Sequence, residues 1–214
     1  MLPDDTRGKI ENITEGVILK GQEDNCTALR NFLCRRFTSG GPVKKNFEGN
    51  ALIKKEQEIL IESFCNDHHL AITELPSHYK YLTHGGEAKI YYSEEEVCVI
   101  KLNDGVYYAT WLEFLNSVLL HNLFFENTSY QLLGFKREGD HLYALLKQPF
   151  IPSDKLAELD DIRKFLEFNG FIHVIRQDYR HPEFGLILED MHDENVLVNS
   201  DTLFFIDTVF YINK

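Results

Sequence analysis

The residues best placed for catalysis lie near the end of the chain, between Glu189 and Asp207. Asp190 precedes Asn195 by five positions, and the apolar run that begins at Val196 leads through a turn to a second apolar run that ends at Asp207. Phosphoryl transfer to a hydroxyl group needs such a set. One carboxylate orients the hydroxyl and accepts its proton, while an amide oxygen and a second carboxylate hold Mg²⁺ on nucleotide phosphates. A tight hairpin would bring Asn195 and Asp207 to one edge, although a surface hairpin with solvated carboxylates is also compatible with so acidic a chain.

A second group of candidate residues lies upstream. Lys101 ends an apolar run, Gly85 and Gly86 separate the two runs before it, and Glu113 is the acidic residue of the helical stretch that follows. A strand lysine can hold nucleotide phosphates, a glycine loop can cover them, and a helix glutamate can pair with the lysine. Each residue alone is also explained as an edge charge, a hairpin turn or an exposed helix position. Their order along the chain is what favours a nucleotide site.

Hydrophobic periodicity predicts the elements that must position these residues. Helical spacing begins at about residue 25, where Asp24 or Asn25 can cap the helix. It recurs at 51–66, 110–125 and 154–169. Short aromatic and β-branched runs predict strands at 79–82, 88–92, 97–102, 130–135, 142–146, 186–188, 196–198 and 203–206. The first twenty residues show little periodicity and are expected to be loosely held, and the charges of the second helix, Lys54 among them, are expected to form a solvated face.

This order of elements predicts an α+β protein with two lobes and an antiparallel meander in the first lobe. We expect a helical N-terminal extension at 1–75, a lobe with an antiparallel sheet and one helix at 76–148, and a minimal second lobe at 149–214. The polar, proline-containing link at 148–152 is expected to be the hinge between the lobes.

Composition excludes several functional classes. The chain has 214 residues, of which 43% are apolar, so it can bury a sizeable core. Its 22 basic and 34 acidic residues give a net charge of −12, which opposes general binding to nucleic acid or to an anionic membrane. No apolar run approaches the roughly 20 residues that span a bilayer, and the N-terminus lacks the features of a signal peptide. The four scattered cysteines favour reduced thiols in the cytoplasm over structural zinc.

Residues 79–210 resemble the protein-kinase-like superfamily. Residues 190–198, which read Asp-Met-His-Asp-Glu-Asn-Val-Leu-Val, are similar to the D-L-H-x-x-N pattern of aminoglycoside and choline phosphotransferases. The chain most resembles the small kinase domains of polyvalent proteins from phages and conjugative elements. The resemblance implies ATP and Mg²⁺ as cofactors, Asp190 as the catalytic base, and Asn195 and Asp207 as Mg²⁺ ligands. It also implies that Lys101 contacts the phosphates and that Glu113 holds Lys101.

Further roles follow from the same resemblance. Gly85 and Gly86 would lie in the loop that covers the phosphates, and Gln148 and Phe150 would lie at a hinge that faces adenine. The adenine ring would sit against apolar side chains such as Ile100 or Ile206. His192 would have a structural role, with a hydrogen bond to a backbone carbonyl.

The chain also departs from the family pattern. Seven residues follow Asp207, without an activation segment, and Asp207-Thr208-Val209 replaces the usual Asp-Phe-Gly. The resemblance therefore implies a two-lobed kinase-like fold with a truncated C-lobe. The acceptor would be gripped by the N-terminal helices and residues 154–179, or by a partner chain.

Three functions remain open. The favoured one is transfer of phosphate from ATP to a hydroxyl, with protein serine, threonine or tyrosine preferred to a small molecule. The first alternative is a pseudokinase, which would be a nucleotide-responsive binding module of a mobile genetic element. The second is an α+β interaction protein without a nucleotide site.

Overall fold

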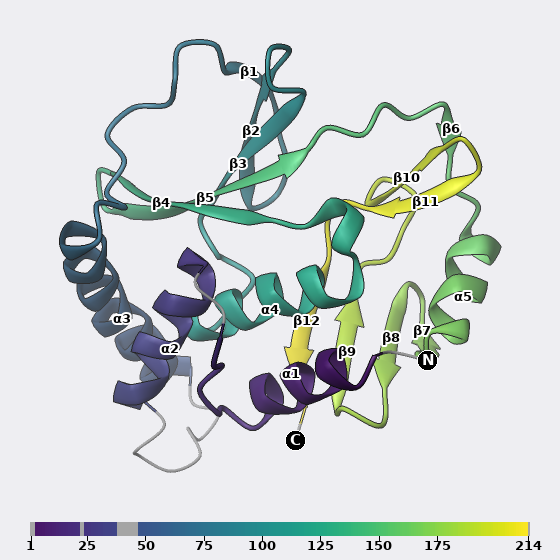
Figure 1. Ribbon diagram of the computed structural model, residues 1–214, viewed down its shortest axis with the longest axis horizontal. Coiled ribbons are helices and arrows are strands. Elements are labelled where there is room, and N and C mark those ends of the chain that lie inside the picture. Colours follow the sequence, from purple (N-terminus) through teal and green to yellow (C-terminus); the bar gives the residue numbers. More distant parts are fainter. Residues whose placement is uncertain (1–2, 22–23, 38–46, 214) are drawn as a thin grey trace. The chain divides into compact units, whose positions relative to one another are not determined.

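The computed structural model of the chain describes residues 3–21, 24–37 and 47–213 (Figure 1). These residues form two compact units. We call the unit made from segments 20–115 and 130–150 the sheet unit, and the unit made from segments 1–19, 116–129 and 151–214 the loop unit. The helix α4 (Trp111–Phe124) contributes its first residues to the sheet unit and the remainder to the loop unit.

The sheet unit is built on five antiparallel strands in the order β1-β2-β3-β5-β4. These strands are β1 (Lys80–His84), β2 (Ala88–Ser93), β3 (Cys98–Asn103), β4 (Gln131–Glu138) and β5 (His141–Pro149). The predicted meander and the two strands after the helix are therefore confirmed. Side chains alternate along each strand, and on one face Tyr79, Ile100, Leu102 and Leu145 form a buried core. Lys101 projects from the opposite face.

Two helices complete the sheet unit, α2 (Asn25–Phe37) and α3 (Phe47–Asp67), and both lie against β4. Asp24 caps α2 as predicted, because its carboxylate accepts hydrogen bonds from the backbone N–H and the hydroxyl of Thr27, at 2.9 and 2.6 Å. The expectation that Lys54 is solvated is wrong. Its ammonium group is partly buried and donates to the carbonyl oxygens of Gly105 (2.6 Å) and Tyr108 (3.0 Å), and desolvation lowers its pKa.

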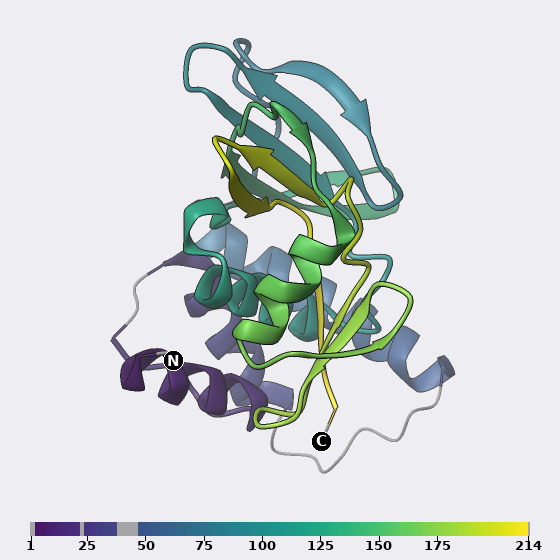
Figure 2. The same cartoon turned by 90° about the vertical axis from the view of Figure 1, so that its right-hand side faces the viewer.

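The loop unit contains two small sheets and two further helices (Figure 2). One sheet has the order β11-β10-β6 and the other the order β12-β9-β8-β7. Their strands are β6 (Lys155–Leu156), β7 (Ile172–Ile175), β8 (Asp178–His181), β9 (Leu186–Glu189), β10 (Val196–Asn199), β11 (Thr202–Phe205) and β12 (Val209–Ile212). The helices are α1 (Asp4–Thr14) and α5 (Leu159–Phe168), with a short 3₁₀ turn, η1, at Glu126–Thr128.

Some elements of the loop unit were not expected from the sequence. The start of the chain is not loosely held, because α1 buries Ile10 and Ile13 almost completely. Strands β6, β7, β8 and β12 were also not predicted, and β6 lies within the segment 154–169 that was predicted to be helical. All four side chains of β7 are exposed, so this strand lacks the alternation by which half-buried strands are recognised.

Two properties of the described residues bear on function. None of the helices formed by residues 3–21, 24–37 and 47–213 is both long and apolar enough to span a membrane. Within the same residues, no three or more histidines, cysteines, aspartates and glutamates are grouped as metal ligands. The α+β class, the N-terminal helices and the antiparallel sheets predicted from the sequence are confirmed.

Candidate functional site

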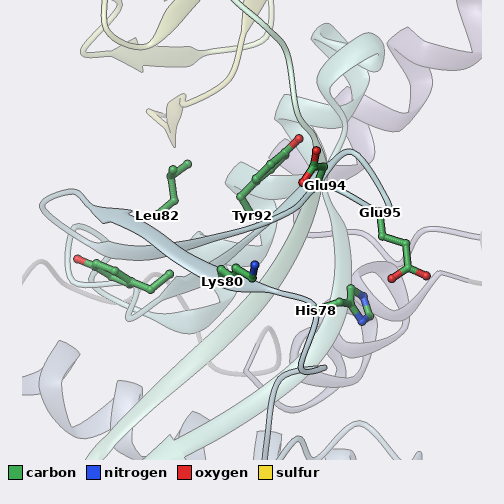
Figure 3. A pocket seen from close by; sticks show the side chains of 7 residues that line it. His78, Lys80, Leu82, Tyr92, Glu94 and Glu95 are labelled. Atoms are coloured by element: carbon green, nitrogen blue, oxygen red, sulfur yellow. The ribbon is translucent and has the colours of Figure 1, made fainter.

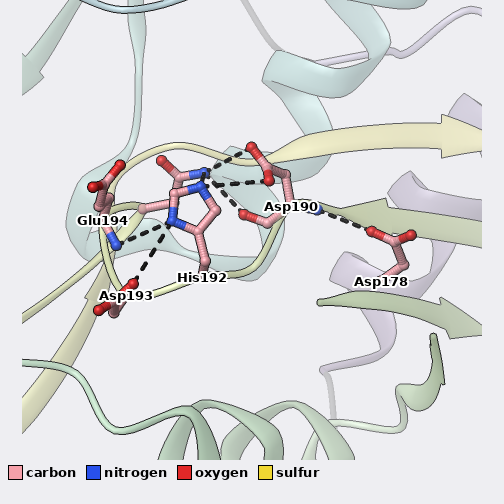
Figure 4. Close-up of polar contacts among 6 residues, drawn as sticks. Asp178, Asp190, His192, Asp193 and Glu194 are labelled. Carbon is pink, nitrogen blue, oxygen red and sulfur yellow. Dashed lines mark hydrogen bonds and ion pairs between the residues drawn. The ribbon is translucent and has the colours of Figure 1, made fainter. Parts of the chain in front are cut away.

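The loop between β9 and β10 holds Asp190 and Asn195 against each other. Figure 4 shows Asp190 in this loop together with His192. The Nδ2 atom of Asn195 donates to the backbone oxygen of Asp190 at 2.8 Å and lies 3.3 Å from its Oδ2 atom. Met191, the residue after Asp190, is buried and anchors the loop. Asp190 has a φ of 65°, in the left-handed region that glycine, asparagine and aspartate adopt more readily than other residues. The loop thus fixes the backbone conformation of Asp190 and places the side chain of Asn195 beside it.

Strand β8 supports this loop from the side. The carboxylate of Asp178 accepts the backbone N–H of Asp190 at 3.3 Å, and the carbonyl oxygen of Gln177 accepts that of Met191 at 3.0 Å. Burial, followed by the charges of Asp178 and Asp190, raises the pKa of Glu189. Sequence reasoning missed Asp178, because only the pairing of β8 with β9 brings it to the loop.

His192 has a structural role, but not with the partner expected from the sequence. Its Nδ1 atom accepts the backbone N–H of Glu194 at 3.2 Å, so the predicted bond to a backbone carbonyl is wrong. Its Nε2 atom lies 3.4 Å from Oδ1 of Asp190. The imidazole therefore lies inside the loop, between the backbone of Glu194 and the carboxylate of Asp190.

The hairpin of β10 and β11 brings Asn195 next to Asp207, as predicted. Val196 pairs with Phe205, and the turn residues Ser200 and Asp201 both have positive φ, as in a type I′ hairpin turn. Beyond the last pair, the carbonyl oxygen of Asn195 accepts the N–H groups of Ile206 (3.0 Å) and Asp207 (3.4 Å).

The oxygen atoms of these residues suit a hard cation such as Mg²⁺. Because the amide nitrogen of Asn195 is turned to Asp190, its Oδ1 atom is the one left to bind a metal. Together with the carboxylate of Asp207 it provides an amide oxygen and a carboxylate from neighbouring positions. The carboxylate of Asp190 lies beside the amide group of Asn195.

Lys101 is a buried cation in the sheet unit. Its side chain projects from β3, and only 4% of the residue is exposed. The ammonium group donates to the hydroxyl of Tyr130 at 3.2 Å and lies 5.3 Å from the centroid of the same ring. Tyr130, which sequence reasoning missed, comes immediately before β4 and therefore helps to aim the lysine.

The structure places the predicted hinge residues at the end of β5. Gln148 pairs with Val99 in β3, and the backbone N–H of Phe150 donates to the carbonyl oxygen of Val97 at 3.0 Å. Tyr92, which also pairs with Val99, lies with its ring 4.6 Å from that of Phe150. The two rings therefore form an aromatic pair at the hinge end of the sheet.

The prediction that Ile100 contacts adenine is wrong, because its side chain lies in the core on the face opposite to Lys101. Val99 and Tyr92 occupy the Lys101 face instead. Tyr92 also lines a surface recess together with Lys80, Leu82 and Glu94 (Figure 3). Ile206 remains a prediction, since nothing in the loop unit tests its contact with a nucleotide.

Gly85 and Gly86 form the loop between β1 and β2. The N–H of Gly85 donates to the carbonyl oxygen of Ala88 at 2.9 Å. A Cβ atom on Gly86 would meet the hydroxyl at the far end of the exposed Tyr107 side chain, which would have to move aside. The pair is thus a tight hairpin loop at the end of the strands that precede Lys101.

Glu113 lies in the first turn of α4 and takes part in its N-terminal cap. Its carboxylate accepts the backbone N–H of Ala109 at 3.0 Å, while the hydroxyl of Thr110 accepts the N–H of Glu113 at 3.2 Å. This arrangement resembles a capping box, except that the glutamate accepts the N–H of the residue before the N-cap. The N–H of Leu112, in the same first turn, donates to the side-chain oxygen of Gln57 from α3. Glu113 therefore has a structural role in addition to the pairing with Lys101 implied by the resemblance.

Comparison with known proteins adds one match. A family model described as a serine/threonine/tyrosine kinase found in polyvalent proteins matches residues 54–214, a segment that includes Lys101, Glu113, Asp190, Asn195 and Asp207. No curated protein matches the chain.

Proposed function

Because the chain belongs to the family of serine/threonine/tyrosine kinases found in polyvalent proteins, we propose that it transfers the γ-phosphoryl group of ATP to a hydroxyl group, with Mg²⁺ on the nucleotide. Membership of this family indicates a phosphotransferase that uses a nucleotide. A serine, threonine or tyrosine of a protein is the acceptor we favour, since the family is described by these three residues. In this proposal the two units are the two lobes of a kinase-like fold.

The observation that carries the proposal is the grouping of Asp190, Asn195 and Asp207. The side chain of Asn195 donates to Asp190, and the backbone N–H of Asp207 donates to the carbonyl oxygen of Asn195, so the three residues are neighbours at one end of the β10–β11 hairpin. Phosphoryl transfer depends on positioning and on electrostatic stabilisation more than on covalent chemistry by the protein. A base beside an amide oxygen and a carboxylate is therefore the arrangement that this reaction uses.

Each residue then has one role. The oxygen of the acceptor hydroxyl attacks the γ-phosphorus atom, the bond from that atom to the bridging oxygen breaks so that ADP leaves, and the hydroxyl proton passes to Asp190. Asn195 and Asp207 would hold the metal. Bound Mg²⁺ would neutralise charge on the phosphate oxygens. His192 and Asp178 keep the carboxylate and the backbone of Asp190 in place.

The proposal also assigns roles in the sheet unit. Lys101 would contact the phosphates, with the hydroxyl of Tyr130 directing its ammonium group. Gly85 and Gly86 would cover the phosphates. Gln148 and Phe150 would face adenine, and the division between the units after Phe150 supports a hinge there.

Two variants test the division of labour between the carboxylates. Asp190→Asn should leave Mg²⁺-dependent binding of ATP unchanged and lower phosphoryl transfer by about 10²–10⁴-fold, because it removes the base alone. Asparagine also tolerates the left-handed backbone at this position. Asp207→Asn should remove the gain in ATP affinity that Mg²⁺ provides. Calorimetric titration with ATP, with and without Mg²⁺, measures binding, and transfer of labelled γ-phosphate to the protein itself measures activity.

The same titrations distinguish the rival functions. If Asp190→Asn loses the Mg²⁺-dependent affinity for ATP as completely as Asp207→Asn does, the two carboxylates do not have separate roles. Binding of ATP and Mg²⁺ by the wild type without transfer to any protein acceptor would indicate a pseudokinase. The absence of nucleotide binding would indicate an interaction protein.

A further inference from the structure

A buried histidine outside the catalytic loop lies close to Asp207. His121 is in the last turn of α4 and is fully buried. Its Nδ1 atom lies 2.8 Å from the hydroxyl oxygen of Thr208, the residue after Asp207. Its Nε2 atom lies 2.9 Å from the backbone oxygen of Thr128. All of these residues belong to the loop unit.

The partners of His121 fix the direction of both hydrogen bonds. A carbonyl oxygen can only accept, so Nε2 carries the hydrogen and donates it to Thr128. In the neutral imidazole, Nδ1 is then the acceptor, and the hydroxyl of Thr208 donates to it. The hydroxyl of Thr128 is in turn 2.6 Å from the carbonyl oxygen of Phe205 and donates there. One chain of hydrogen bonds therefore runs from Thr208 through His121 and Thr128 to Phe205.

These hydrogen bonds hold the residues on both sides of Asp207, the candidate metal ligand. Phe205 comes two residues before Asp207 and Thr208 comes directly after it, so both sides of the turn between β11 and β12 are tied to the segment from α4 to η1. The ring of Phe205 also stacks on that of Phe125, with centroids 4.3 Å apart and planes at 17°. Farther along, the hydroxyl of Ser117 accepts the N–H of Phe210 at 3.0 Å.

We propose that His121 is a positioning residue that holds the turn at Thr208, so that the carboxylate of Asp207 is presented to Mg²⁺. The inference rests on the proposed function, because Asp207 binds a metal only in that case. It also explains the threonine in the Asp207-Thr208-Val209 segment, where the resemblance implies phenylalanine. A hydroxyl at this position can bond to the imidazole, whereas a phenyl ring cannot.

Two substitutions of His121 separate its two hydrogen bonds. In His121→Asn, the amide group occupies the position of Nδ1, so the bond to Thr208 can form and the bond to Thr128 is lost. In His121→Gln, the amide group reaches the position of Nε2, so the bond to Thr128 can form and the bond to Thr208 is lost. Thr208→Val removes the same bond from the other side without changing the histidine.

We expect His121→Gln and Thr208→Val to weaken Mg²⁺-dependent binding of ATP by about tenfold, the effect of one ordinary hydrogen bond. Binding of ATP without Mg²⁺ should not change. His121→Asn should restore most of the loss. In the nucleotide-free protein, the amides of residues 206–209 should exchange hydrogen faster in His121→Gln and Thr208→Val than in His121→Asn, as measured by NMR.

Ser117→Ala is the matched control, because it removes a buried hydrogen bond from the same helix but leaves the turn at Asp207 intact. It should lower stability without changing the Mg²⁺ dependence. If His121→Asn and His121→Gln reduce Mg²⁺-dependent affinity equally and only in proportion to lost stability, as Ser117→Ala does, the inference is overturned. If the His121 variants do not fold, Thr208→Val decides by itself, and wild-type affinity and amide exchange in that variant would overturn the inference.

The amide-exchange measurement keeps this inference separate from the proposed function. If the wild type shows no Mg²⁺-dependent nucleotide binding, the proposed function fails, and with it the link from His121 to a metal. If the wild type binds ATP and Mg²⁺ and the exchange of residues 206–209 is the same in all variants, the function stands and the role of His121 is wrong.

Discussion

Lys101 combines a charge with burial, and this combination constrains what the residue can do. An ammonium group removed from water needs polar partners, because an isolated buried charge is strongly unfavourable. The structure provides the hydroxyl and the ring face of Tyr130. Both come from one side chain that is anchored at the start of β4. The lysine is therefore held in one place before any nucleotide binds, which lowers the entropy lost on binding.

Replacement of Lys101 by methionine tests whether this placement serves nucleotide binding. Lys101→Met keeps an unbranched side chain of similar length and removes only the charge, so the protein should stay folded. The affinity for ATP should fall by about 10- to 100-fold, which corresponds to a hydrogen bond to a charged group. Equilibrium titration of ATP in the presence of Mg²⁺ measures the change. An unchanged affinity in a folded variant would show that Lys101 does not contact the phosphates.

Residues that are close in sequence could be predicted as a site, whereas those joined only by strand pairing could not. Asn195 and Asp207 were expected to meet, because one hairpin with a recognisable turn connects them. Asp178 and Tyr130 were missed, because strand pairing alone brings Asp178 to the loop between β9 and β10, and Tyr130, just before β4, to Lys101. Ile100 was placed on the wrong face, because a strand that is buried on both faces is apolar at successive positions and does not reveal which face holds the site.

At the scale of the element, the N-terminus of α4 is completed by residues from outside the helix. A helix leaves its first N–H groups without partners inside the helix. The hydroxyl of Thr110 accepts the N–H of Glu113, and the side chain of Gln57, from α3, accepts that of Leu112. The carboxylate of Glu113 accepts the N–H of Ala109, just before the helix. Lys54, one turn earlier in α3, binds the carbonyl oxygens of the loop that leads into α4. The start of α4 is therefore set by α3 as well as by its own sequence.

Two substitutions of Glu113 separate its capping role from the pairing with Lys101. The side-chain oxygen of a glutamine can accept the same N–H of Ala109, so Glu113→Gln should keep the stability of the wild type. Glu113→Ala should lower the free energy of unfolding by about 0.5–2 kcal/mol, as the loss of a cap does. Denaturant titration of both variants, alongside ATP affinity, provides the comparison. A loss of ATP affinity in Glu113→Gln without a loss of stability would show that the carboxylate also acts on Lys101.

At the scale of the whole chain, both units include residues that precede the segment matched by the family model. The loop unit buries Ile10 and Ile13 from α1, and the sheet unit buries Leu29 and Leu33 from α2. Arg7 in α1 also pairs with Glu183, next to β9. Periodicity predicted α2, whereas α1 was missed because it is short and presents few apolar residues. The N-terminal helices are thus part of the cores of the two units.

A core substitution in α1 measures this contribution. Ile13→Ala removes buried methylene and methyl groups and should lower the free energy of unfolding of the loop unit by about 2–5 kcal/mol. Val17→Ala, at a position that is 45% exposed, is the control and should change it by less than about 1 kcal/mol. Thermal unfolding followed by circular dichroism compares the two. Equal effects of both substitutions would mean that α1 does not stabilise the unit.

The left-handed backbone of Asp190 also bears on how such a gene can evolve. Asparagine and glycine adopt this conformation readily, and aspartate codons become codons for either residue by a single base change. Replacement of Asp190 by asparagine or glycine is therefore compatible with the backbone conformation of the loop. If Asp190 is the base, as proposed, a lineage can pass from an active enzyme to a folded, inactive descendant by a route that selection for folding does not block.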